Sequence, residues 1–309
     1  RLCFQNFHGS GQLGVRGALR RKEDISARNA DPYLHASWDF KPNWTLGAGV
    51  RHSDVRFDTR DHYVAPGNGD DSGAMSFRAT TPVLSISHRV GPNSVAYISA
   101  ARSFETPTLN EVAYASVSGA QTGWNSGLKP SKGTQHEVGA KWHDNGGGAS
   151  LQAALFRVRT QDEIGVAQNA AGRSVFRNVG ATERLGLELS GQARIAPSWS
   201  TRLAASWTRA KYQDTFNGNG GVVNEGNALP GVPPRTVWLE LIWRPETAGW
   251  HSALTWRHRG RLWANDVNDA FAPSGQAWSW RAGWRHVAQD WRVDATLWID
   301  NIAGHEPVA

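Results

Sequence analysis

Arginine at alternate positions is the most suggestive chemical pattern in this sequence of 309 residues. Arg257, Arg259 and Arg261 alternate along one segment, and Arg281 lies in a second alternating segment. Side chains two residues apart in a β-strand point to the same face, so these arginines form a basic row. Because arginine offers a fixed fork of donors to carboxylates, the row predicts a site for an anionic ligand. The alternative is that the arginines pair with acidic side chains such as Glu240.

Patterns for catalysis or metal binding are missing from the sequence. The eleven histidines form no His-Glu-x-x-His motif and have no metal-ligand spacing to neighbouring carboxylates. No Gly-x-Ser-x-Gly motif is present, which argues against a nucleophile elbow. The single cysteine, Cys3, excludes an intrachain disulfide and a zinc site built from cysteines. We therefore expect no catalytic residue, no metal and no cofactor, and predict that the protein is not an enzyme.

Charge and hydropathy narrow the possible classes of protein. The formal net charge is +6, but the arginines are spread singly, unlike the clustered basic patch typical of a nucleic-acid partner. The mean hydropathy is −0.50, and no apolar run approaches the ~18–20 residues of a membrane-spanning helix. Low hydropathy does not argue against a transmembrane β-barrel, because only every second residue of its strands faces lipid.

Apolar and polar residues alternate with a period of two through most of the chain, which predicts β-strands. Short turns and long connections alternate between these strands, as in outer-membrane barrels with tight periplasmic turns and long extracellular loops. The predicted fold is an all-β, antiparallel, up-and-down transmembrane β-barrel with the basic row facing its lumen. We expect thirteen strands, at 11–20, 31–40, 44–57, 77–90, 94–103, 133–144, 149–164, 174–195, 199–211, 235–244, 250–263, 276–287 and 291–301.

Tryptophan residues mark one end of the expected strands. Trp44, Trp199, Trp250 and Trp291 each follow a short turn directly. Their amphipathic rings suit a membrane–water interface, so we predict that they belong to an aromatic girdle in contact with outer-membrane lipid. The alternative is a soluble β-sandwich or propeller in which each ring packs over its own turn. The alternation of turn lengths favours the girdle.

Several motifs follow one another in an order that is similar to a known family. The first contains Phe104, Pro107, Thr108, Asn110 and Glu111, in the pattern F-x-x-P-T-x-N-E at the end of an expected strand. Further motifs follow at 128–131, 137–139, 178–180, 186–189 and 229–233. Together they resemble the TonB-dependent receptors, a family of bacterial outer-membrane transporters. Residues 301–306 depart from the pattern that this family has there.

The resemblance implies an architecture and a set of partners. It implies a 22-stranded barrel occluded by a plug, energised through a TonB box by TonB, ExbB and ExbD. Residues 1–309 are then part of the barrel, with the plug and the TonB box outside this sequence. The expected strand number also predicts further strands before Arg1 and after Ala309, because closed barrels of this kind have an even count. The expected function is active uptake of a scarce small-molecule ligand across the bacterial outer membrane.

The resemblance also bears on the identity of the ligand. Residues 61–73 and 264–266 resemble the branch of the family that transports pyrroloquinoline quinone, a tricarboxylic acid that suits a row of arginines. A ferric siderophore or another metal chelate is the alternative within the family. From other classes, a barrel enzyme would need a catalytic group near the mouth, and a passive porin would need an open lumen without a plug.

Overall fold

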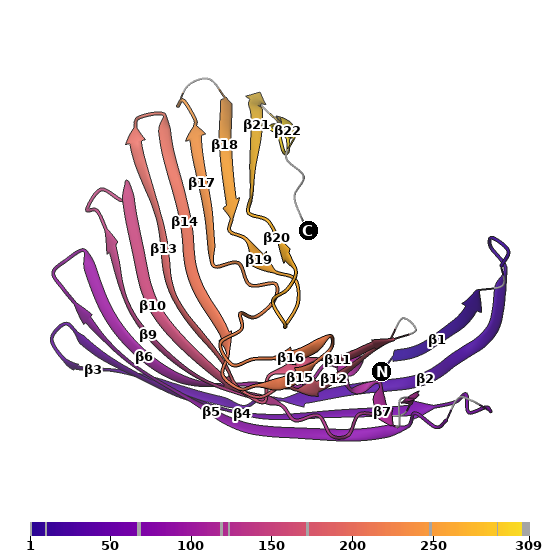
Figure 1. Ribbon diagram of the computed structural model, residues 1–309. Helices are drawn as coiled ribbons and strands as arrows, with labels where there is room; N and C mark the ends of the chain where they lie inside the picture. The colour runs from indigo at the N-terminus through magenta and orange to yellow at the C-terminus, as the bar shows by residue number, and fades with distance from the viewer. Residues whose placement is uncertain are drawn as a thin grey trace.

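The computed structural model describes the chain except residues 1, 10, 67–68, 118–119, 123, 171–172, 247–248, 289 and 305–309. One large antiparallel sheet runs through it and curves into an open half-pipe (Figure 1). Neighbours in the sheet follow one another along the chain, and among the described residues no ladder joins β1 to β22. Its strands are β1 (Leu2–Gly9), β2 (Arg16–Ala30), β3 (Tyr33–Lys41), β4 (Trp44–Asp61), β5 (Gly73–Arg89), β6 (Ser94–Glu105), β9 (Ser131–His143), β10 (Ala149–Gln161), β13 (Thr182–Ala196), β14 (Trp199–Tyr212), β17 (Arg235–Trp243), β18 (Trp250–Arg259), β21 (Gly275–Ala288) and β22 (Trp291–Ile299).

Strands β2 and β3 occupy one position in the sheet. β2 pairs with the second half of β4, and β3 pairs with its first half. Pro32 separates them, because proline has no backbone N–H to donate to the ladder. The sheet therefore has thirteen strand positions, as expected, but the prediction for the first forty residues was wrong. The expected loop 21–30 is part of β2; it was interpreted as a loop because of the charged run at 20–24. Strand β1 was not predicted.

The register places apolar side chains in rows across the outer face of the sheet. One row crosses five neighbouring strands, and its members are 36 to 57% exposed. It consists of Ile98, Val138, Leu155, Leu187 and Trp207. The opposite face carries polar rows, one of which contains Arg202, Glu240, Thr255 and Ser279. An exposed apolar face opposite a polar one is the pattern of a transmembrane barrel wall and confirms the predicted fold class.

The long connections contain small elements of their own. They are α1 (Leu109–Val112), β7 (Ala115–Val117), β8 (Ala120–Thr122), β11 (Ile164–Ala170), β12 (Arg173–Asn178), β15 (Phe216–Gly218), β16 (Gly221–Val223), β19 (Leu262–Trp263) and β20 (Phe271–Ala272). The single strand expected at 174–195 was wrong, because β12 pairs with β11 whereas β13 joins the main sheet. The hairpins lie at the end of the sheet away from its short turns (Figure 1). No helix among the described residues is long and apolar enough to cross a membrane.

A small hydrophobic core holds these connections together. It contains Val179, Ala210, Tyr212, Val223 and Leu229, each at most 6% exposed. Ala210 and Tyr212 come from the end of β14, and the others come from the connections. The core therefore fixes the loop end of the sheet, where burial of apolar side chains supplies the stability that the lipid-facing strands do not obtain from a packed interior.

Candidate ligand site

The motif at 104–111 forms a capped turn at the end of β6. Thr108 precedes α1, and its hydroxyl accepts a hydrogen bond from the Glu111 amide at 3.3 Å. The Glu111 carboxylate in turn accepts from the Thr108 amide at 2.6 Å, which completes a capping box. Pro107 and Val112 are fully buried on either side of it, while Phe104 is half-buried and Asn110 is exposed. The motif therefore fixes the start of the connection 106–130.

Asn178, at the end of β12, joins two connections through its side chain. Its amide group donates to the carbonyl oxygens of Lys129 and Asp162 at 2.9 and 2.8 Å. Its side-chain oxygen accepts from the Lys129 amide at 2.9 Å. One side chain thus holds the connection after β6 against the connection after β10. This accounts for two of the motifs, at 128–131 and 178–180, in terms of loop structure.

Gly180 follows in a backbone conformation that favours glycine, with φ of +93°. A Cβ atom built on it would lie 2.6 Å from the Asp214 carboxylate, which is too close for any other residue. That carboxylate accepts from the Ala181 amide at 2.7 Å. The close approach ties the start of β13 to the connection after β14, so the hairpins are gathered into one cluster.

A chamber of about 440 Å³ opens between these connections. Its walls come from β11, the loop ends of β13 and β14, and segments 229–232 and 264–266. The side chains that supply its charge and its donors are Glu163, Arg184, Tyr212 and Asp266. We refer to this hollow as the loop chamber. Its volume lies within the range of small-molecule sites.

The polar groups of the loop chamber are held in pairs. Arg184 binds the Glu163 carboxylate with two hydrogen bonds of 3.2 Å, and the buried Thr182 hydroxyl donates to the same carboxylate at 2.7 Å. The Tyr212 hydroxyl donates to Asp266 at 2.7 Å. Burial, and then this hydrogen bond, raise the pKa of the Tyr212 phenol, so it remains a neutral donor. The chamber can offer both donors and acceptors to a ligand without a large net charge.

The four arginines of the predicted basic row have different partners in the structure. Arg281 donates to Glu240 at 3.0 Å, and Arg202 lies 3.6 Å from the other carboxylate oxygen of Glu240. Glu240 is 5% exposed, so the two guanidinium groups balance a carboxylate that would be costly to bury alone. The pairing with Glu240 that the sequence left open is thus present for Arg281.

The other three arginines differ in their contacts. Arg257 donates to the Ser279 hydroxyl at 3.0 Å and lies 3.5 Å from Asp300. Arg259 donates to the backbone carbonyl of Pro273 at 3.3 Å. Strand β18 ends at Arg259, so the prediction that one strand runs from 250 to 263 was wrong. Arg261 lies beyond that end, with its guanidinium 5.1 and 4.9 Å from the ring centres of Trp263 and Phe271.

The four tryptophans are the first residues of β4, β14, β18 and β22. Trp199, Trp250 and Trp291 are 40, 52 and 77% exposed, and Trp44 stacks on His88 at 4.2 Å. All four share the face that carries the exposed apolar rows, by alternation along their strands. Their place in an aromatic girdle remains a prediction.

Tyr212 and Asp266 were missed as site residues by the reasoning from sequence. Tyr212 lies one residue beyond the expected strand 199–211, and Asp266 lies in the run Asn265 to Asp269, rich in Asn and Asp. Such a run is typical of an ordered turn, and Asn268 indeed bonds the Ala228 backbone at 2.7 and 2.9 Å. The contact between positions 212 and 266 depends on how the connection that contains Asp266 folds over the end of β14, which no local pattern indicates.

Parts of the chain are similar in sequence to known proteins. The ferrioxamine receptor of Yersinia enterocolitica is 28% identical over 149 residues, which are 48% of this chain and 19% of that protein. The catecholate siderophore receptor Fiu of Escherichia coli K12 is 30% identical over 151 residues, again 48% of this chain and 19% of the relative. The chain thus spans well under a third of the length of these relatives.

Solved structures share the same fold. The siderophore receptor PiuA from Acinetobacter baumannii superposes with a TM-score of 0.73 at 18% identity, over 96% of this chain and 42% of PiuA. The ferric yersiniabactin uptake receptor FyuA from Yersinia pestis gives 0.70 at 20% identity, over 92% of this chain and 42% of FyuA. The model of the family described as TonB dependent receptor-like, beta-barrel, matches residues 4–302. The chain belongs to this family of receptors and transporters.

Proposed function

We propose that the protein is a TonB-dependent transporter of the bacterial outer membrane that takes up a ferric siderophore or a related metal chelate. Its family supports the transport class, and the relatives above are named as receptors for such ligands. The observation that carries the proposal is the loop chamber, a preorganised hollow at the end of a barrel wall. No reaction is assigned to it; its polar groups bind and orient a ligand.

The ligand first meets the connections and is then transferred toward the lumen. In the loop chamber, the Arg184 guanidinium offers its remaining N–H donors to an anionic chelate, and the Tyr212 hydroxyl, whose proton is donated to Asp266, offers an acceptor. The neighbouring carboxylates limit the negative charge that the chelate can carry. Arg257 and Arg259 on β18 lie on the polar face and offer further donors to carboxylate or hydroxamate oxygens. Release into the periplasm needs energy from TonB, ExbB and ExbD, acting on a plug within the barrel.

Pyrroloquinoline quinone is the second candidate ligand. The resemblance of residues 61–73 and 264–266 to its transporters favours it, and Asp266 of that second segment lies in the loop chamber. Arg257 and Arg259 suit its three carboxylates as well as they suit a chelate. The two ligands differ in that only the chelate carries iron, which makes them separable by experiment.

Uptake by cells that express the complete protein tests the proposal. We expect saturable accumulation of iron-55 from ferrioxamine B or from a ferric catecholate, and loss of this accumulation when a protonophore removes the energy supply. Energy-dependent uptake of pyrroloquinoline quinone without iron uptake would select the second candidate. Diffusion of small sugars that is insensitive to the protonophore would instead indicate a porin and refute active transport.

A further inference from the structure

Arg177, in β12, carries two buried hydrogen-bond donors that have no acceptor. Its Nε and Nη2 atoms are buried, and neither has a hydrogen-bond partner among the residues that the structure describes. The N–H groups of these two atoms form one edge of the guanidinium, and this edge can hold both oxygens of a carboxylate in a bidentate pair. Because charged donors are costly to bury without an acceptor, the edge is suited to receive an anion.

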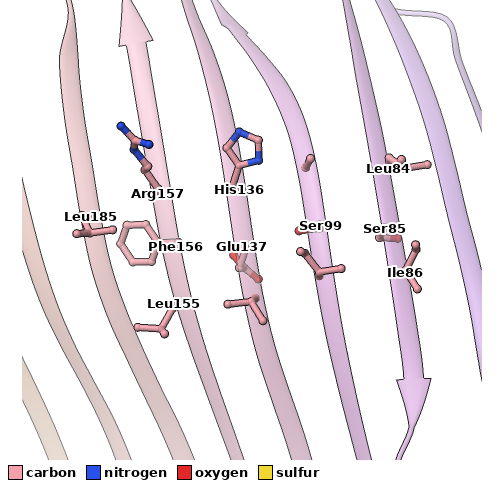
Figure 2. Close-up of a pocket in the computed structure, with 13 residues that line it drawn as sticks. Leu84, Ser85, Ile86, Ser99, His136, Glu137, Leu155, Phe156, Arg157 and Leu185 are labelled. Carbon is pink, nitrogen blue, oxygen red and sulfur yellow. The ribbon is translucent and has the colours of Figure 1, made fainter.

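Two exposed arginines show what this edge holds elsewhere in the chain. Arg157 lies beside an apolar hollow on the outer face of the sheet (Figure 2), and its Nε and Nη2 atoms donate to Glu183 at 2.8 and 2.5 Å. Arg56 uses the same two atoms to bind both carboxylate oxygens of Asp58, each at 3.0 Å. The edge that a carboxylate fills on these exposed arginines is the one that lacks a partner on the more buried Arg177.

Three acids in the neighbouring connections are bound to other groups. Each accepts a hydrogen bond at 3.2 Å or less: Glu163 from Arg184, Asp214 from the Ala181 amide and Asp266 from the Tyr212 hydroxyl. Pairing any of them with Arg177 would break one of these hydrogen bonds and leave its donor unsatisfied. The structure therefore reserves these acids for other donors and leaves the edge of Arg177 to another carboxylate.

Arg177 lies next to the loop chamber. Gly165, which pairs with Arg177 across the β11–β12 ladder, is part of the chamber wall. The guanidinium lies over the Phe216 ring, 5.5 Å from its centre, and that ring contacts the ring of Tyr212, with 5.1 Å between their centres. Tyr212 is part of the wall, as is Asn219 in the turn of the β15–β16 hairpin. Arg177 is thus one residue removed from the chamber through β11 and also through Phe216.

We propose that Arg177 binds a carboxylate of the ligand that occupies the loop chamber, and so selects a ligand with a free carboxylate over one that carries none. The two carboxylate oxygens accept from Nε and Nη2 while the guanidinium stays over Phe216. Entry of the carboxylate needs the β15–β16 hairpin to move, and Gly220 and Gly221 give its turn that freedom, with φ of +121° and +143°. This inference rests on the proposed function, because it names the chemical class of the ligand at the same site.

Succinate, a small dicarboxylate, tests the site without the transported ligand. Hydrogen exchange of the complete receptor is followed in succinate and in chloride at equal ionic strength, in peptides that cover 164–170 and 173–178. The variant is Arg177→Met, which keeps an unbranched side chain but has no donor. Arg244→Met is the matched control, because Arg244 is exposed and lies at the opposite end of the sheet, next to a short turn.

We expect succinate to slow exchange at 173–178 in the wild type and in the control, and to have no effect in Arg177→Met. With a dissociation constant of about 10 mM, about 100 mM succinate slows exchange roughly tenfold. In chloride, Arg177→Met should unfold at the wild-type temperature or above it, because the substitution removes donors that have no acceptor. No slowing in the wild type, or equal slowing in Arg177→Met, would overturn the proposal. A lower unfolding temperature of the variant without any effect of succinate would also overturn it, by showing that another part of the protein already holds Arg177.

A pair of ferric chelates then tests the selection. Ferrioxamine B is acetylated on its terminal amine, which leaves it without a carboxylate, or succinylated there, which adds one. In calorimetry the succinylated chelate should bind the wild type tenfold or more tightly than the acetylated one, and the ratio should fall to about one in Arg177→Met. Equal affinities in the wild type would overturn the selection. If neither chelate binds while succinate still slows exchange, the proposed chelate is refuted and the carboxylate site stands.

Discussion

Replacing Asn178 tests whether one side chain holds the loop cluster in place. Asn178→Ala removes three hydrogen bonds, to Lys129 twice and to Asp162 once, with lengths of 2.8 to 2.9 Å. A hydrogen bond contributes about 1 kcal/mol net, and less where water competes, so we expect a loss of about 2 kcal/mol in the free energy of local opening. That loss corresponds to roughly a 30-fold rise in the rate of amide hydrogen exchange, if exchange follows local opening.

Hydrogen exchange followed by mass spectrometry on the complete protein gives the measurement. The peptides that should respond cover 126–132 and 162–166, including the Glu163 amide, which donates to the Gly180 carbonyl at 3.0 Å. Asn178→Asp keeps the acceptor for the Lys129 amide but loses both donors, so it should show most of the effect. Asn169→Ala is the control, because the Asn169 side chain accepts from Ser174 within the β11–β12 hairpin at 2.8 Å.

The outcome separates a structural clamp from an incidental contact. If exchange at 126–132 is unchanged in Asn178→Ala, the three hydrogen bonds do not limit opening and the reasoning is refuted. A rise that is equal in Asn169→Ala would show a general loosening of the hairpin. The barrel strands should keep their protection in every variant, because none of these bonds belongs to the main sheet.

The remaining predictions concern the capping box, the buried carboxylate and the basic row. Thr108→Ala should cost about 1 kcal/mol in local stability through loss of the N-cap, seen as faster proteolysis between 106 and 127, whereas Thr134→Ala on the outer face should not change the cleavage. Glu240→Gln should lower the thermal unfolding temperature, because Arg281 and Arg202 lose their shared counter-charge, and should raise the affinity for an anionic ligand in calorimetry; unchanged values for both would show that the pairing is unimportant. Arg257→Ala should weaken binding of an anionic ligand by about tenfold without a change in unfolding temperature, and unchanged affinity in the Ala variants of Arg257, Arg259, Arg261 and Arg281 would remove the basic row from the site.

The fold could be predicted from the sequence because a barrel wall repeats one signal. In a wall strand, every second side chain faces lipid and must be apolar. The alternation at Leu185, Leu187 and Leu189 therefore indicates both that the segment is a strand and which of its faces is apolar. The errors arose where that constraint ends. Beyond the apolar rows a strand can carry charged side chains, as at residues 20–24 of β2, where Glu23 is fully buried beside Arg21. Charge there no longer distinguishes a strand from a loop. Strand β12 ends at Asn178 and β13 begins at Thr182, and the sequence pattern gave no sign of the interruption between these two strands.

The site was harder to predict, because it is built by contacts between connections. The alternation of Arg257 and Arg259 is visible within one short segment of sequence. The ion pair between Arg281 and Glu240 instead joins two residues that are 41 positions apart. The stacking of Arg261 on Trp263 and Phe271 required the β19–β20 hairpin, which the expected strand 250–263 excluded. Tyr212 and Asp266 come into contact only when the connection after β18 folds over the end of β14, and no local sequence pattern indicates that contact.

The residues that reveal the family and the residues that would select the ligand are different sets. Thr108 and Glu111 form a cap, Asn178 joins two connections, and Gly180 permits a close approach to Asp214. These roles are structural and suit any ligand. The loop chamber is instead lined by side chains such as Tyr212 and Asp266 that lie outside those roles. A resemblance through the first set therefore identifies the fold of the family, and substitutions in the second set are the ones that we expect to change which ligand binds.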